Sequence, residues 1–486
     1  MALLVRREVI VPYLGYGKVL ADVERETDTW MGLYAGDDAC IGVVNTQVRP
    51  EVRDDERGQS LRFWSKIEMT VLSFPTEVRL NGNAWASLKR GLREFDFSIV
   101  SEAHKIHIAA TIDEGVLKGE IQTGGEVLPL EIPVGDNLLL SSDLGTAALN
   151  VPGIEVGEEI FIDTFDPMTL SVTKAKIECI GEESIRYGDK DVLTKVFVTH
   201  VGGFTSKAWV SADEEVLRAE TPFGFILKKI TQEQAVTEMR PRDAESVISL
   251  MSIRPTGKTP QRGALWMRLG IENMPAETEL PVDDTQLRGG LGRYIIRIPE
   301  NPVVEGRVLP DVEKAEYTES DTFVQSSHPK IVAMSKEIVG DEQDPWQRAM
   351  RIYQWVYDNI DKVPVMSLPS ALEVLKSKEG DCNEHTVLFT ALARAAGIPA
   401  RIAIGIVWSD ELAGFYYHAW PEVYMGRWTW MDPTLGQPMA DATHIKLLTG
   451  SIEKWSQLLP YLGKLQIEIV DIGYTREPAS ETSETP

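Results

Sequence analysis

The fold is decided by residues 370–406, which read SALEVLKSKEGDCNEHTVLFTALARAAGIPARIAIGI. Within this stretch, Asp381 and Glu384 match a capping box, in which two side chains satisfy the backbone N–H groups at a helix start. The helix predicted from this box runs through TALARAA and stops at Gly397, because a glycine followed closely by a proline is a typical C-terminal stop. We therefore expect Cys382 at the first position of a well-specified helix.

A cysteine at a helix start is a candidate nucleophile. The unpaired N–H groups there carry about half a positive charge, which stabilises a thiolate, and thiolate is the nucleophilic form of cysteine. Together with the imidazolium of the partner histidine described below, this helix start predicts a Cys382 thiol pKa below the value of about 8.5 for a free cysteine. A small, packed and unreactive cysteine is the alternative, because surroundings rather than residue type decide reactivity.

Two further helices are predicted upstream of this cysteine. Ser370 and Glu373 match a capping box for a short helix over ALEVLK. In DPWQRAMRIYQWVYDNI, Asp344 can cap a longer helix and Pro345 suits its first position. The apolar face of this longer helix is predicted from side chains that recur at steps of three and four, namely Trp346, Met350, Tyr353, Tyr357 and Ile360.

The segment FYYHAWPEVYMGRWTWMDPT predicts a β-hairpin that carries a histidine and an aspartate. A three-residue loop of Tyr424, Met425 and Gly426 would place His418 directly opposite Asp432, with the glycine in the left-handed position that such loops favour. A loop of two residues would instead turn Asp432 to the other face of the hairpin. We expect the three-residue loop.

Cys382, His418 and Asp432 together fit nucleophilic catalysis. A nucleophilic cysteine needs a base that takes its proton, and the base needs a third group that orients it. The motifs GDCNEH, YHAWPEVY and WTWMDPT, with the spacers between them, resemble the three motifs of the transglutaminase-like superfamily over roughly residues 325–450. The resemblance implies a papain-like core with Cys382 as nucleophile, His418 as base and Asp432 as orienting carboxylate.

Other residues near these motifs are candidates for an oxyanion donor or for zinc ligands. The backbone N–H of Cys382 is the expected oxyanion donor, while Trp355 is a second candidate whose helical spacing favours core packing. Cys382 and His385 have C-x-x-H spacing and could hold zinc with His418 or His444, but no further ligands cluster in the sequence, so we expect neither a metal nor a cofactor.

The rest of the chain predicts an α+β protein of several domains. Short alternating runs with turn residues between them predict a large antiparallel β domain over residues 1–235, whose core includes Cys40 and Cys179. Residues 236–315 read as a small β module or linker, 316–473 as the catalytic domain, and 474–486 as a polar, disordered tail.

Composition excludes several classes of partner. The net charge of −25 disfavours nucleic acids and anionic membrane surfaces, because both repel an acidic protein. No stretch approaches the roughly 18 apolar residues of a membrane span, and the first residues lack the order of a signal peptide. The sequence as written therefore predicts a cytoplasmic protein, or a periplasmic or secreted one if the reading frame starts upstream.

The function predicted from these residues is that of a bacterial thiol enzyme acting on amide bonds of peptides or proteins, with water favoured over an amine as the acceptor. Two alternatives stay open. One is a non-catalytic peptide- or envelope-binding scaffold, against which the complete set of Cys382, His418 and Asp432 counts. The other is a protein-crosslinking transglutaminase, which needs an amine to compete with water at roughly 55 M.

Overall fold

The computed structural model describes residues 26–475 apart from short stretches, which are 36–38, 72–73, 102–104, 124, 136–137, 141–153, 167–169, 202–203, 222–224, 239–251, 275–278, 291, 364–369 and 451–464. The contacts divide the chain into two compact units, one up to Val247 and one from Ile248 onward. Most of the tail predicted to be disordered lies outside the described residues. The described residues are mostly β structure with few helices, and the large β-rich part agrees with the α+β architecture predicted from the sequence.

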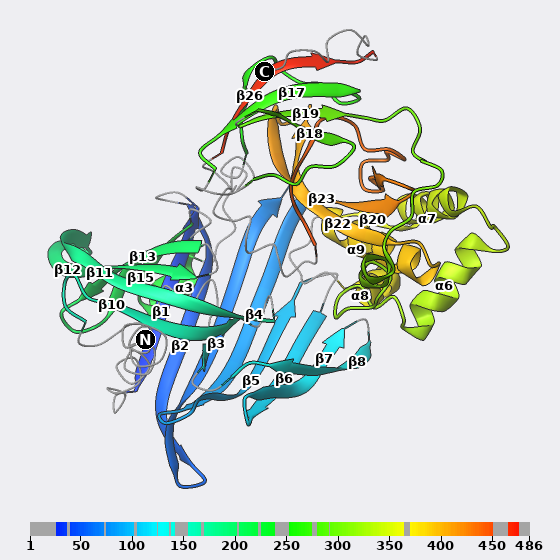
Figure 1. Ribbon diagram of the computed structural model, residues 1–486. Coiled ribbons are helices and arrows are strands. Elements are labelled where there is room, and N and C mark those ends of the chain that lie inside the picture. Colours follow the sequence, from blue (N-terminus) through cyan, green and yellow to red (C-terminus); the bar gives the residue numbers. More distant parts are fainter. Residues whose placement is uncertain are drawn as a thin grey trace, which may run out of the picture. The chain divides into compact units, whose positions relative to one another are not determined.

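The first unit is built around one extensive sheet (Figure 1). Its strands are β1 (Thr27–Ala35), β2 (Ala39–Arg53), β3 (Glu56–Val71), β4 (Phe74–Ser87), β5 (Gly91–Val100), β6 (Lys105–Asp113), β7 (Val116–Thr123), β8 (Glu126–Pro133), β9 (Leu138–Leu140), β10 (Glu159–Asp166), β11 (Ser171–Tyr187), β12 (Lys190–Val201), β13 (Phe204–Ser211), β14 (Val216–Glu220) and β15 (Phe225–Ile230). The short helix α3 (Gln232–Glu238) follows the last of them.

The strands of this sheet pair in the order β4-β3-β2-β1-β15-β14-β13-β12-β11-β10-β9-β5-β6-β7-β8, and β4 also pairs with β5. The strands from β1 to β5 and from β9 to β15 therefore form a closed ring, and β6, β7 and β8 extend the sheet beyond β5. The pairs are antiparallel, except that β9 runs parallel to β5 and β10.

Side chains that alternate between the two faces of each strand form the core of this unit. In β6, the buried side chains are Ile106, Ile108, Ala110 and Ile112, and the residues between them are more exposed. Cys40 and Cys179 are buried, as predicted.

The second unit contains a five-stranded sheet in the order β16-β26-β17-β19-β18. The bounds of its strands are Thr256–Gly257 for β16, Trp266–Glu272 for β17, Gln286–Gly290 for β18, Arg293–Arg297 for β19 and Gln466–Gly473 for β26. The segment interpreted from sequence as a small β module is thus completed by β26, a strand from the far end of the described chain.

The same unit contains the helices and the sheet that carry the motifs. The helices are α5 (Asp311–Glu316), α6 (Pro329–Val339), α7 (Pro345–Asn359), α8 (Ala371–Ser377) and α9 (Cys382–Ala395). The four-stranded sheet has the order β24-β23-β22-β25, with bounds Ala400–Ser409 for β22, Gly414–Tyr424 for β23, Trp428–Trp430 for β24 and His444–Thr449 for β25. A small parallel pair joins β20 (Asp361–Lys362) to β21 (Glu379–Gly380).

Helix α9 lies at the centre of this arrangement (Figure 1). It packs against β22 and β23 on one side and against α6, α7 and α8 on others, so its residues from Asn383 to Ala393 are all buried. A helix that is covered all round holds its first residue in a fixed place. Among the described helices, none is long and apolar enough to cross a membrane.

Helix α7 begins as predicted but buries a different face. Asp344 is its N-cap, accepting a hydrogen bond from the Gln347 N–H at 2.8 Å, and Pro345 is its first residue. Of the predicted face, Tyr353 and Ile360 are buried, whereas Tyr357 is exposed. The buried face is completed by smaller side chains, which are Ala349, Ile352 and Val356. The predicted stripe was therefore wrong in part, because α7 packs against both α6 and α9 and buries Ala349, Ile352 and Val356 there rather than Tyr357.

The capping box predicted for α8 is also wrong. Ser370 is the N-cap residue, but its side chain makes no capping hydrogen bond. The hydroxyl instead exchanges hydrogen bonds with the Gln325 side chain, which also accepts from the Leu372 N–H at 3.2 Å. A residue distant in sequence thus supplies the cap.

The hairpin register differs from the prediction by two residues. Strands β23 and β24 pair Glu422 with Trp430 and Tyr424 with Trp428, so the loop is formed by residues 425–427. His418 is therefore not directly opposite Asp432, and that expectation was wrong. A shift of two residues preserves the face, however, because side chains alternate with a period of two. Asp432 leaves the strand just after β24 and still points toward the imidazole.

Candidate active site

The start of α9 is fixed by the capping box predicted from the sequence. The Asp381 carboxylate accepts from the Asn383 N–H at 2.9 Å, and the Asp381 N–H donates to Glu384 at 3.0 Å. Gly380 is required before this box, because a Cβ there would lie 2.2 Å from the Cβ of Glu384. Cys382 is therefore the first residue of the helix, as predicted.

Strand β23 runs alongside this helix start. The Thr386 hydroxyl, one turn into α9, donates to the Ala419 carbonyl at 3.0 Å. The Cys382 thiol itself lies within hydrogen-bonding reach of the Ala419 backbone. Because Ala419 directly follows His418, the packing of α9 on β23 brings the thiol beside the strand position that carries the histidine.

The electrostatic surroundings of the thiol differ from the sequence expectation. Burial raises the pKa of the Cys382 thiol well above its ordinary value, and the carboxylate of Asp381 raises it further. The predicted lowering of this pKa was therefore wrong, because it took account of the helix dipole and the imidazolium but not of burial or of the neighbouring acid that the capping box itself requires. At neutral pH these surroundings favour the uncharged thiol.

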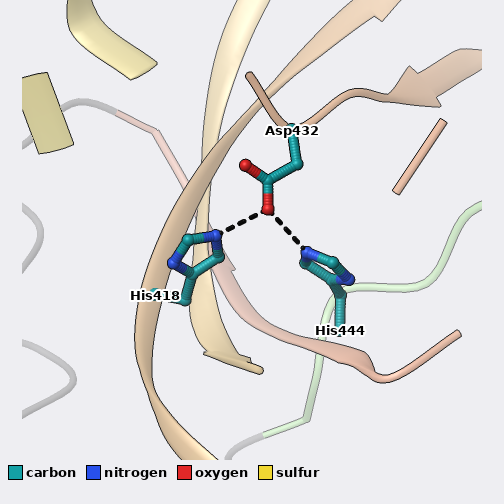
Figure 2. Close-up of side chains that lie close together, drawn as sticks. All are labelled: His418, Asp432 and His444. Atoms are coloured by element: carbon teal, nitrogen blue, oxygen red, sulfur yellow. Dashed lines mark hydrogen bonds and ion pairs between the residues drawn. The ribbon is translucent and has the colours of Figure 1, made fainter. Parts of the chain in front are cut away.

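His418 and Asp432 form a buried hydrogen bond (Figure 2). The Nε2 atom of His418 lies 2.8 Å from Oδ2 of Asp432, and the aspartate has no exposed surface. The loop after β24 holds the carboxylate: its Oδ1 accepts the Leu435 N–H at 2.9 Å, and the Asp432 backbone exchanges two hydrogen bonds with Gln437. Burial opposes ionisation, but His418 and His444 hold the pKa of Asp432 well below its usual range.

A second histidine, His444, contacts the same carboxylate oxygen (Figure 2). It begins β25, is fully buried, and places Nε2 at 3.1 Å from Oδ2 of Asp432. The sequence offered His444 only as a possible zinc ligand. Its position was not predictable from spacing, because the loop after Asp432 folds back before β25 starts. We refer to His418, Asp432 and His444 as the histidine cluster.

The four side chains considered as possible zinc ligands do not come together as a set. Within the described residues, the one group of potential ligands is the histidine cluster, whose ligand atoms lie within 4.8 Å of one another. Cys382 and His385 are not part of it. The His385 Nδ1 is 2.7 Å from the Asp381 carbonyl, and its Nε2 is buried without a hydrogen-bond partner. The separations inside the cluster, 2.8 and 3.1 Å, are those of hydrogen bonds.

Two tryptophans of the second unit, Trp420 and Trp355, have different surroundings. Trp420 is fully buried, with its ring centroid 6.1 Å from that of His418 and 5.0 Å from that of His444, so it covers both imidazoles. Trp355 lies on α7, where the Lys378 ammonium is 4.1 Å from its ring centroid. Trp420 therefore adjoins the cluster, and Trp355 makes a cation–π contact.

A separate set of charged side chains lies further along the same strands. Lys446 of β25 is fully buried and forms ion pairs with Glu422 of β23 and with Asp283. The other oxygen of Glu422 accepts from Arg401 at 2.5 Å, and Trp430 donates to Asp283 at 3.2 Å. Burial works against ionisation of Asp283, but Lys446 lowers its pKa. We refer to Arg401, Glu422, Lys446 and Asp283 as the lysine cluster.

The family comparison falls on this part of the chain. Residues 332–433 match the model of the transglutaminase-like superfamily. These residues form a transglutaminase-like domain. The match includes Cys382, His418 and Asp432, and it ends before His444. This match agrees with the family resemblance indicated by the three sequence motifs.

Solved structures show distant similarity. A candidate cysteine protease from Cytophaga hutchinsonii is 18% identical, covers 46% of this chain and 89% of its own, and has a TM-score of 0.28. The periplasmic domain of TgpA from Pseudomonas aeruginosa is 13% identical, covers 37% and 90%, and has a TM-score of 0.23. A candidate protease from Parabacteroides distasonis is 12% identical, covers 72% and 68%, and has a TM-score of 0.22. At such scores these likenesses establish no shared activity. No curated protein matches the chain.

Proposed function

We propose that the transglutaminase-like domain is a thiol enzyme that hydrolyses amide bonds of peptide or protein substrates through an acyl-enzyme on Cys382. The observation that carries this proposal is the buried hydrogen bond between His418 and Asp432, on the strand against which the helix start of Cys382 packs. Nucleophile, base and orienting carboxylate are the three roles that such chemistry requires. The family match supports a thiol enzyme in the broad sense.

In the acylation step, the Cys382 sulfur attacks the carbonyl carbon of the amide. Asp432 occupies Nε2 of His418, which leaves Nδ1 to take the thiol proton as the S–C bond forms. Because burial and Asp381 favour the uncharged thiol, proton transfer to His418 accompanies the attack. The tetrahedral intermediate then collapses: the C–N bond breaks, and the amine leaves with the proton that His418 returns.

In the deacylation step, His418 takes a proton from water, whose oxygen attacks the thioester carbonyl. The C–S bond breaks, the carboxylic acid is released, and the proton on His418 returns to the Cys382 sulfur. The negative oxygen of each tetrahedral intermediate needs a fixed donor. The Cys382 backbone N–H, the first of α9, is the donor we assign, and the positive end of the helix dipole adds to it.

The proposal is tested by incubating a peptide library with the full chain and following products by mass spectrometry. We expect cleaved or deamidated peptides from the wild type and none from Cys382→Ala, with both proteins showing the same circular dichroism. Equal product from the variant would contradict the assignment. Adding excess primary amine separates the acceptors: amine adducts that dominate over hydrolysed products, and that vanish in Cys382→Ser, would make the protein a transglutaminase.

A further inference from the structure

Both ring nitrogens of His444 face oxygen atoms that can only accept hydrogen bonds. Nε2 lies 3.1 Å from the carboxylate of Asp432, and Nδ1 lies 3.0 Å from the Asp441 carbonyl and 3.4 Å from an Asp441 carboxylate oxygen. A neutral imidazole carries one N–H and one lone pair, so one of these contacts would set a lone pair against an oxygen. The doubly protonated ring satisfies both contacts.

The surroundings of His444 can hold a positive charge. Burial by itself would lower the pKa of His444, but the hydrogen bonds to Asp432 and Asp441 raise it above its ordinary value. Asp441 is itself anchored, because it accepts from the Arg262 side chain at 3.2 Å and from the Gly263 N–H at 2.8 Å. The buried cation is therefore paired on both sides, the condition under which a buried charge is tolerated.

We propose that His444 is a positioning residue that stays protonated in the resting enzyme, neutralises Asp432 and thereby keeps His418 an uncharged base. This inference rests on the proposed function of His418. It assigns to Asp432 a role in orientation, since much of its negative charge is already balanced by His444.

Charge repulsion gives the size of the expected effect. The ring centroids of His418 and His444 are 5.6 Å apart. A cation at that distance, in surroundings with an effective dielectric constant of about 20, disfavours a second cation by about two pH units. Other charged or titratable groups act on the cluster from neighbouring elements. These are Arg262 beside Asp441, Lys362 after α7, Cys382 and His385 of α9, and Tyr353 of α7, whose pKa is raised to about 12 by burial and by Asp432.

The charge of His444 can be measured without a substrate. In the full chain labelled with ¹⁵N-histidine, we expect one histidine whose two nitrogens both carry protons from pH 6 to pH 9, and the His444→Gln variant should lack that signal. A His444 signal that reports a neutral tautomer, or that titrates near the ordinary value of about 6.5, overturns the proposal.

The effect on the base is measured by the pH dependence of kcat/KM. Glutamine at position 444 can still donate to Asp432 but carries no charge, so in His444→Gln the acid limb should move to higher pH by about two units. His385→Gln, which removes another fully buried histidine of the same unit, is the matched control and should leave the limb in place. An unshifted limb in a folded His444→Gln variant overturns the proposal. If no activity is found at all, the proposed function fails, while the labelling experiment still decides the charge.

Discussion

The histidine cluster and the lysine cluster lie on the same two strands but differ in what their charges can do. His418 and Glu422 both belong to β23, and His444 and Lys446 both belong to β25. Each cluster has a fully buried carboxylate that contacts two nitrogen-bearing side chains. In one the partners are imidazoles, which can change charge near neutral pH, and in the other they are an ammonium and a guanidinium, which cannot.

This difference suits the histidine cluster to proton transfer and the lysine cluster to stabilising the fold. A group that gains and loses a proton near neutral pH can serve as a base, whereas a fixed ion pair can only hold its neighbours in place. The lysine cluster joins β23 and β25 to Asp283, which precedes β18, so it connects the four-stranded sheet to the five-stranded sheet. We therefore expect substitutions in the first cluster to change rates and substitutions in the second to change stability.

The largest effect is expected from Asp432→Asn. An asparagine keeps the size of the side chain but cannot hold His418 in the required tautomer, so kcat should fall by about 10²- to 10⁴-fold. Peptide hydrolysis under saturating substrate measures this change. Glu422→Gln is the matched control in the lysine cluster, and its folded fraction should retain kcat within a few-fold. Equal losses of kcat in the two variants would remove the distinction between the clusters.

A smaller effect, on stability, is expected from Lys446→Met. Methionine fits the buried stem but leaves Asp283 without its cation, and breaking a buried pair in this way costs about 3–5 kcal/mol. Urea unfolding followed by tryptophan fluorescence measures the change. Adding Asp283→Asn to Lys446→Met should recover part of the loss, since it removes the uncompensated carboxylate. If Lys446→Met unfolds at the wild-type urea concentration, the cluster is not the support we infer.

The smallest effect concerns the charge beside the nucleophile. Because burial and Asp381 raise the pKa of the Cys382 thiol, its alkylation by iodoacetamide should show a midpoint above the free-cysteine value of about 8.5. Asp381→Asn preserves the N-cap while removing a negative charge, so the midpoint should fall. Cys40 and Cys179 are buried and should react slowly in both proteins. A wild-type midpoint below 8 would restore the expectation drawn from the helix dipole.

The sequence predicted local features well and tertiary ones less well. The capping box of Asp381 and Glu384 was predictable because its hydrogen bonds lie within four residues, and it placed Cys382 correctly. The face shared by His418 and Asp432 was predictable from the period of two, although the register was not. Neither the part of Gln325 in capping α8 nor the contact of His444 with Asp432 was predictable, because both depend on how distant segments pack.

The central claim is that Cys382 forms the acyl-enzyme, and trapping that intermediate tests it most directly. The full chain is mixed with p-nitrophenyl acetate, quenched in acid within the first turnover and digested for peptide mapping by mass spectrometry. The account predicts an acetyl group on Cys382 in the wild type, and a much smaller amount in His418→Ala, in which the base is missing. An acetyl group on another residue, or acetylation of Cys382 that is equally fast without His418, would contradict it.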